Sequence, residues 1–418
     1  MDFESILYMA TRTRSSTRTV RKMTTETLAK KDVLALLVML YNFKFLGLVP
    51  AKFEMITKPT YHWRFTSTRL SRSYNLILVI FIMTWGIVTT NAEIHGYYQT
   101  TKSSFEVLIV LIKSYMRCIA ACFSLLVFAF KANEFVQLIN KLMTIKDMSQ
   151  LINEKTSVTF KKLLWSCIKI HIAFSVLWFI KRFPWNYFEV IYVINSIAYF
   201  LSINIINGIF VQYMFFLLFF KLEIRILNET LMDMGQPRIA QLIRLDVKQI
   251  RRNKLMRLFK LYTALHTFSQ DLSHFYALSL LIDVPEILLA LILHIYRLLY
   301  QHVENQWYGD LNYPLHIYRS LLFGLLLISI PLSLTIVVTG CVNETEKTGR
   351  IISSMLMDPQ NAFMSNELNK FSITLTFQKI DFTVYGFFSL KEKLMISIGN
   401  VLTTYVMIIV QWRKQTKE

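Results

Sequence analysis

The sequence predicts an all-α membrane protein with seven transmembrane helices, a cytoplasmic N-terminus and an extracellular C-terminus. First, 54% of its 418 residues are hydrophobic and only 17% are charged, which is not the balance of a soluble multidomain protein. Second, its apolar runs are long enough to cross a hydrocarbon core of about 30 Å, which takes roughly 20 helical residues. Third, lysine and arginine alternate sharply between the segments that join these runs.

Seven apolar runs meet the length requirement. They cover residues 74–92, 105–130, 163–182, 188–220, 274–300, 316–340 and 394–412, which together form a seven-helix transmembrane domain over 74–412. An eighth run, 33–49, is short and is interrupted by Asn42 and Lys44. We expect it to form an interfacial or half-inserted helix within a cytoplasmic N-terminal segment, residues 1–73.

The orientation follows from the charges between the spans. Of the 41 Lys and Arg in the connecting segments and tails, with Lys181 and Arg182 at the end of span three counted among them, 35 fall in 1–73, 131–162, 221–273 and 341–393, and 6 fall on the other side. The positive-inside rule places the 35 in the cytoplasm. A crossing at 33–49 would instead turn the basic stretch "WRFTSTRLSRS" outward. Residues 221–273 and 341–393 are thus predicted to be cytoplasmic anchor segments, with helices running on from spans four and five.

Several classes of protein are excluded. The chain has no P-loop, no His-Glu-x-x-His, no Gly-x-Ser-x-Gly and no metal-spaced His or Cys set. We therefore expect no catalytic residues, no metal site and no cofactor. We expect that the protein is not an enzyme. The net charge of +19 accompanies a mean hydropathy of +0.41, which favours membrane lipid over nucleic acid as a partner. The orientation is also the inverse of a G-protein-coupled receptor.

Ionisable residues inside the spans mark a candidate ligand pocket, because such groups are costly in a membrane unless they are paired or wetted. Asp283 and Glu286 share one face of span five, and the opposite charge is available on Lys113, Arg117 and Lys169. These groups could form inter-helix salt bridges or the polar floor of a cavity for a small molecule. Spans three and four add aromatic and amide groups, as small-molecule pockets do. The candidate pocket residues are Lys113, Arg117, Trp178, Tyr192, Asn195, Tyr199, Asp283 and Glu286.

The last span carries a polar stripe. At about 100° per residue, Ser397, Asn400, Thr404, Ile408 and Gln411 fall within about 80° of one another. A polar stripe on an apolar helix cannot face lipid. It is expected either to bond neighbouring helices or to line water around a symmetry axis.

Three stretches resemble the insect gustatory receptors. "TYVMIIVQ", Thr404 to Gln411, matches their ending of Thr-Tyr, five apolar residues and Gln, and "VYGFFSLKEKLMISIGN" and "FKFLGLVP" are similar to stretches that these receptors keep upstream. The resemblance implies the fold of the gustatory and odorant receptor channels, a tetrameric ligand-gated cation channel whose last span lines the pore. It places Thr404, Tyr405 and Gln411 at signature positions and Ile408 at an apolar gate that works by dewetting.

The resemblance also implies a function. The expected protein is a gustatory receptor of the plasma membrane of chemosensory neurons, a homo- or hetero-tetramer with related receptors that conducts monovalent and divalent cations when a small-molecule tastant binds. Val406 stands where the sugar-receptor branch has an acidic residue, which favours a bitter or other non-sugar tastant. The alternatives are an odorant receptor of the same fold and a non-channel transporter. A transporter predicts internal repeats or paired broken helices, and the sequence has no repeat.

Overall fold

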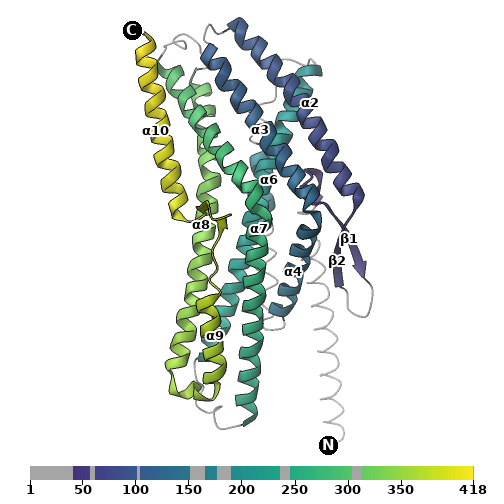
Figure 1. The fold of residues 1–418 in the computed structure, drawn as a ribbon, viewed down its shortest axis with the longest axis vertical. Coiled ribbons are helices and arrows are strands. Elements are labelled where there is room, and N and C mark those ends of the chain that lie inside the picture. The colour runs from purple at the N-terminus through teal and green to yellow at the C-terminus, as the bar shows by residue number, and fades with distance from the viewer. Residues whose placement is uncertain are drawn as a thin grey trace, which may run out of the picture.

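The protein is described from a computed structural model, which covers residues 41–56, 62–100, 104–150, 165–176, 190–235, 245–303 and 313–417. The described chain is mainly helical, and its helices form one elongated bundle (Figure 1). The C-terminus lies at one end of the long axis, and the tips of α7, α8 and α9 lie at the other.

Over its described residues, each of the seven predicted spans falls on a helix. In chain order these are α2 (Arg69–Thr100), α3 (Ser104–Phe130), the short helix Trp165–Val176, α6 (Val190–Gly235), α7 (Leu245–Val303), α8 (Tyr313–Met357) and α10 (Glu392–Lys417). Within the described residues, α2, α6, α7 and α8 are long and apolar enough to cross a membrane, and the bent pair α3–α4 makes a fifth candidate. The predicted all-α membrane fold is confirmed.

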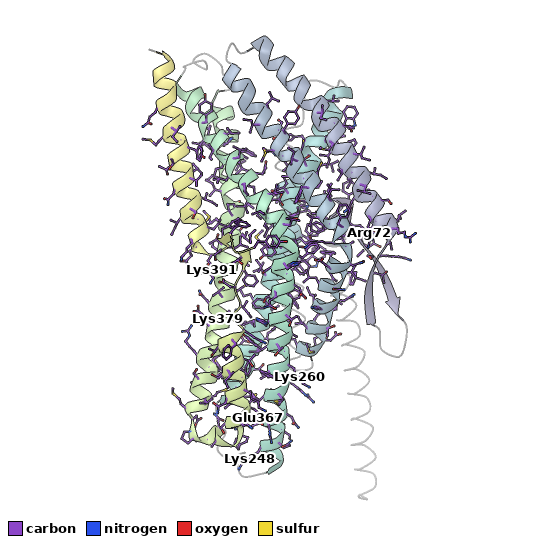
Figure 2. The ribbon with its side chains drawn as sticks, in the orientation of Figure 1. Arg72, Lys248, Lys260, Glu367, Lys379 and Lys391 are labelled. Carbon is purple, nitrogen blue, oxygen red and sulfur yellow. The ribbon has the colours of Figure 1, made fainter. Side chains whose placement is uncertain are left out.

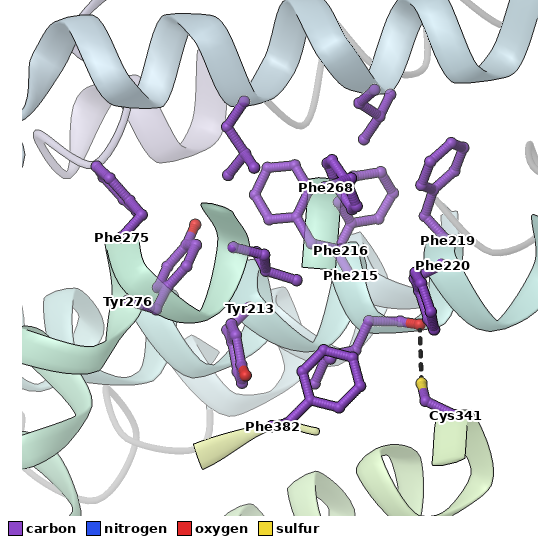
Figure 3. Packing of buried hydrophobic residues seen from close by; sticks show 14 of the residues in the cluster. Tyr213, Phe215, Phe216, Phe219, Phe220, Phe268, Phe275, Tyr276, Cys341 and Phe382 are labelled. Carbon is purple, nitrogen blue, oxygen red and sulfur yellow. Dashed lines mark hydrogen bonds between the residues drawn. The ribbon is translucent and has the colours of Figure 1, made fainter. Parts of the chain in front are cut away.

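Helix α6 is the centre of the bundle. It is apolar on all sides, which is the pattern of a helix that is buried all round, and α2, α3, α7 and α8 pack against it. Its rings Phe216 and Phe219 lie 6.2 and 6.0 Å from Phe268 of α7 (Figure 3). These rings form the middle of a core that continues through Phe275, Tyr276 and Phe382.

Three helices run far beyond the apolar spans. α6, α7 and α8 have 46, 59 and 45 residues, and at 1.5 Å per residue α7 is about 88 Å long, nearly three times the thickness of a hydrocarbon core. The predicted helical continuations of spans four and five are therefore present. The 3-10 helix η2 (Pro359–Met364) and α9 (Ser365–Phe377) fold back against α8, and α9 also contacts α7.

Three features were not expected from the sequence. α4 (Ala132–Gln150) continues α3 after a bend of 72°. Strands β1 (Ala51–Ile56) and β2 (His62–Ser67) form an antiparallel hairpin that pairs Ala51 with Ser67. Strands β3 (Thr383–Val384) and β4 (Phe388–Ser389) form a second hairpin, which leads into α10.

The described end of the run 33–49 packs into the protein. Residues 33–40 lie outside the described part, 41–45 are helical, and Phe43 and Leu48 are buried in the main core. Gly47 makes the turn, with φ +77°, and a Cβ there would lie 2.7 Å from Leu125 and 2.9 Å from the Asn75 side chain. Only glycine fits this close approach.

Candidate ligand site and pore-lining helix

Arg117 of α3 is held on two sides in the middle of the bundle. Its Nε lies 3.1 Å from Oε1 of Glu286 on α7, and Nη1 donates a hydrogen bond to the Tyr199 hydroxyl of α6. The guanidinium carbon also lies 4.9 Å from the centroid of the Tyr199 ring. Arg117 and Glu286 are 3% and 4% exposed. Spans two and five were predicted to bring opposite charges together, and Arg117 and Glu286 do so.

Asp283 has a different partner. It is fully buried, one helical turn from Glu286, and the Ser124 hydroxyl of α3 lies 3.3 Å from each of its carboxylate oxygens. Ser124 is a site residue that the sequence analysis missed. It lies seven residues after Arg117, hence on the same face of α3, and that spacing was the signal available to find it.

The remaining candidate pocket residues cannot be placed in this cluster. Trp178 lies outside the described residues, and the side chains of Lys113, Tyr192 and Asn195 are also outside the described part of the structure. Lys169, the third cation considered as a partner, has an exposed side chain. The structure therefore brings together Arg117, Tyr199, Asp283 and Glu286 of the eight predicted residues.

The buried cluster offers directional hydrogen bonding in an apolar surrounding. The guanidinium and the Glu286 carboxylate compensate each other, and the serine hydroxyl supplies Asp283 with a donor, so each charged group has a polar contact. A few convergent polar groups among apolar and aromatic side chains are typical of a site that orients a small organic molecule. The arrangement contains nothing that resembles a nucleophile with its base.

The polar stripe of α10 lies on the side of the helix that faces away from the bundle. Helix α10 stands at the edge of the bundle, against α7 and α8 (Figure 1). Leu394 and Ile398 face the bundle and are buried, and Leu402 packs partly against the core. All five stripe residues are exposed, namely Ser397, Asn400, Thr404, Ile408 and Gln411. Tyr405 is also exposed but lies about 100° around the helix from Thr404, outside the stripe.

Within the stripe, the hydroxyl group of Thr404 hydrogen-bonds to its own helix. The Thr404 Oγ1 donates a hydrogen bond of 2.9 Å to the Asn400 carbonyl. This bond uses the hydroxyl proton. The lone pairs of the oxygen can still accept hydrogen bonds on the exposed face. Ile408, one turn farther on, is 52% exposed and is the single apolar member of the five.

The chain was compared with known proteins by sequence. Residues 36–416 match the sequence profile of the family described as 7tm Chemosensory receptor. A 71-residue stretch is 37% identical to the putative gustatory receptor 28b of Drosophila melanogaster. That stretch covers 17% of this chain and 15% of the relative, so the detailed similarity spans a short part of both proteins.

The fold was compared with solved structures. The olfactory receptor OR5 of the insect Machilis hrabei matches with a TM-score of 0.59 over 90% of this chain and 97% of the receptor, at 12% identity. The same receptor in complex with eugenol matches with a TM-score of 0.60 over 92% and 98% of the two chains, at 11% identity. At these identities the likeness concerns the fold, and the fold is that of chemosensory receptors and not of enzymes. Because the family profile spans nearly the whole sequence, the chain belongs to the 7tm chemosensory receptor family of multi-pass membrane proteins.

Proposed function

We propose that this protein is a gustatory receptor that works as a ligand-gated cation channel, with four subunits around a central pore. The observation that carries the proposal is the polar stripe of α10, which is exposed along its whole length on the subunit. In a bilayer such a stripe needs water or polar partners. Fourfold symmetry supplies both, because four stripes face one another around an aqueous path.

Ile408 is proposed as the gate. A ring of four isoleucine side chains makes a short apolar constriction between the Thr404 layer and the Gln411 layer, and water leaves a narrow apolar constriction. The Gln411 amide supplies dipoles without a fixed charge, which suits the passage of monovalent and divalent cations. Tyr405 is assigned to packing beside the pore, because it lies off the stripe.

The buried cluster of Arg117, Tyr199, Asp283 and Glu286 is proposed as the polar part of the ligand site. Its hydrogen-bonding groups suit a small organic molecule with a hydroxyl or carbonyl group. The solved olfactory receptor with eugenol supports a small-molecule ligand for this fold. Trp178, Tyr192, Asn195 and Lys113 remain candidates for the rest of the site, and Val406 favours a bitter or other non-sugar tastant.

The similarity to a gustatory receptor favours taste over smell, and an odorant receptor of the same fold is the alternative. Either function places the protein in the plasma membrane of chemosensory neurons, in a homo- or hetero-tetramer. A non-channel transporter is disfavoured, because the stripe has no role in a carrier whose substrate path lies between two repeats.

The experiment is a substitution at the gate. Ile408→Ser keeps the helix but allows water to bridge the constriction, so whole-cell recordings should show cation current without ligand. We expect the ligand-independent current to reach a large share of the maximal current of the unmodified channel.

Leu402→Ser is the matched control. Leu402 lies about 120° around α10 from Ile408 and packs against the core, so the same change should lower surface expression without opening the pore. A silent Ile408→Ser channel together with a leaking Leu402→Ser channel would assign the pore to the opposite side of α10.

A further inference from the structure

A groove lies where the first apolar helix begins. It has a volume of about 920 Å³, and its walls are the chain from Tyr41 to Lys52 and the first turns of α2 from Thr68 to Ile77. The walls are fixed relative to each other by two hydrogen bonds. The Tyr74 hydroxyl donates to the Phe45 carbonyl at 2.7 Å, and the Asn75 amide donates to the Gly47 carbonyl at 2.8 Å. These two bonds make the groove a fixed part of the folded structure.

The lining of the groove is amphiphilic. Apolar and aromatic groups form most of it, and three of them are largely exposed: Phe45 at 66%, Leu70 at 83% and Ile77 at 62%. Two cations, Lys44 and Lys52, also line the groove. Among the described residues of its lining, none is acidic. A molecule that fits this surface combines a long apolar part with an anionic group.

The apolar part of the groove continues along α2. Leu70, Ser73, Ile77, Ile80 and Ile87 follow one another at spacings of three, four or seven residues and share one face of the helix. Ile80 and Ile87 are 64% and 48% exposed, and no charged residue occurs between Arg72 and Glu93. This face of α2 is a surface for acyl chains.

The groove lies beside Arg72, whose neighbours Ser71 and Ser73 line it. Arg72, in the first turns of α2, lies close to the level of Lys391 just before α10 (Figure 2). Lys260, Glu367 and Lys248 lie beyond that level, toward the end of the molecule opposite the C-terminus. By the positive-inside rule this is the cytoplasmic boundary of the spans, whose leaflet is rich in anionic lipids.

We propose that this groove is a binding site for an anionic phospholipid of the surrounding leaflet. Lys44 and Lys52 hold the phosphate and headgroup, and an acyl chain lies past Leu70 and Ile77 along the exposed face of α2. The site is separate from the Arg117 cluster. A membrane lipid would therefore bind at the junction between the N-terminal segment, α2 and α3.

The test uses the full-length protein, purified and exchanged into mixed micelles that contain palmitoyl-oleoyl phosphatidylserine and phosphatidylcholine in equal amounts. Native mass spectrometry counts the lipids that stay bound to each subunit. We expect phosphatidylserine to be retained in preference to phosphatidylcholine. Lys44→Gln with Lys52→Gln should weaken the phosphatidylserine binding by about 30-fold, since each such cation contributes about 1 kcal/mol toward an anionic lipid.

Two further variants decide between the groove and a general charge effect. Lys260→Gln with Lys379→Gln removes the same charge from exposed positions outside the groove and should leave the binding unchanged. Ser73→Trp fills the groove without a change of charge and should remove the bound lipid, while the unfolding temperature shows that the protein is intact. Equal retention of the two lipids, an equal loss in the control pair, or full binding in Ser73→Trp would each overturn the proposal.

Discussion

Arg117 and Glu286 illustrate how one buried ion pair constrains two helices. Removal of one partner leaves an uncompensated buried charge, which typically costs 3–5 kcal/mol, whereas replacement of both by apolar residues of similar volume is often neutral or stabilising. The Nε–Oε1 distance of 3.1 Å and the nearly complete burial place the pair in this class.

We therefore predict that Glu286→Leu sharply lowers surface expression and that the double variant Arg117→Met, Glu286→Leu restores it. Surface labelling of tagged receptors measures both. If the cluster binds the ligand, the restored double variant should still fail to respond to agonist, and a normal response would assign the pair to packing alone. Normal expression of the single variant would contradict the buried-charge argument.

A substitution at Asp283 tests the ligand site with a smaller change in side-chain shape. Asp283→Asn keeps the shape of the side chain and its contact with Ser124, but it removes the charge. Because the hydrogen bonds of this carboxylate in the described structure come from the Ser124 hydroxyl and from no cation, we expect expression close to that of the unmodified receptor. Agonist potency should change by about tenfold, equivalent to about 1.4 kcal/mol, as measured by dose–response currents. Poor expression with unchanged potency would mean that Asp283 has a structural role.

At the scale of elements, α6 and α8 are joined beyond the spans by a polar network. The Asn228 amide donates to the Glu344 carbonyl at 2.9 Å and to its Oε2 at 3.1 Å, and the Thr348 hydroxyl donates to the Asn228 Oδ1 at 2.7 Å. Asn228 and Thr348 are buried. The network fixes the register of two helices that continue past the apolar runs.

Asn228→Ala should destabilise this part of the bundle by about 1–3 kcal/mol, because it leaves buried polar groups without partners. The thermal unfolding of the purified protein measures the change. Asn343→Ala is the matched control, since Asn343 begins the same tripeptide, Asn-Glu-Thr, but is exposed on α8. Equal effects of the two substitutions would show that the network contributes nothing.

Two helices of similar apolar character can also occupy different positions in the bundle. α6 and α10 are both apolar helices of the predicted membrane domain, yet α6 is surrounded by four helices and α10 touches α7 and α8 at the edge of the bundle. Both helices carry polar residues, but in α10 four of them share one exposed stripe with Ile408. A polar stripe at the edge of the bundle is consistent with the proposed assembly, in which the stripes of several subunits face one another.

At the scale of the whole molecule, the proposed orientation follows from charge. An epitope at residue 1 should be accessible only after cells are permeabilised, and an epitope at residue 418 should be accessible on intact cells, because 35 of the 41 Lys and Arg of the loops and tails lie on one side. Immunofluorescence of tagged receptors measures this. Equal accessibility of the two epitopes, or a glycan on Asn343, would contradict the seven-span orientation.

Much of the fold could be predicted from the sequence, because the relevant signals are local. A run of about 20 apolar residues must be helical in a bilayer, since each backbone polar group needs a partner within its own segment. The positions of the seven predicted spans follow from that rule, whereas the continuation of α6 and α7 was expected from the helical pattern of residues 221–273. The grouping of the α10 stripe follows from helical periodicity over fifteen residues, from Ser397 to Gln411, without knowledge of any neighbour.

The tertiary structure alone decided which distant groups meet. The sequence offered several cations for the acids of span five, and only packing shows that Arg117 meets Glu286, 169 residues away. The α3–α4 bend, the contact of Asp283 with Ser124 and the groove beside Gly47 arise in the same way. Each depends on the distance and rotation between helices far apart in the chain, which helical periodicity within one segment does not encode.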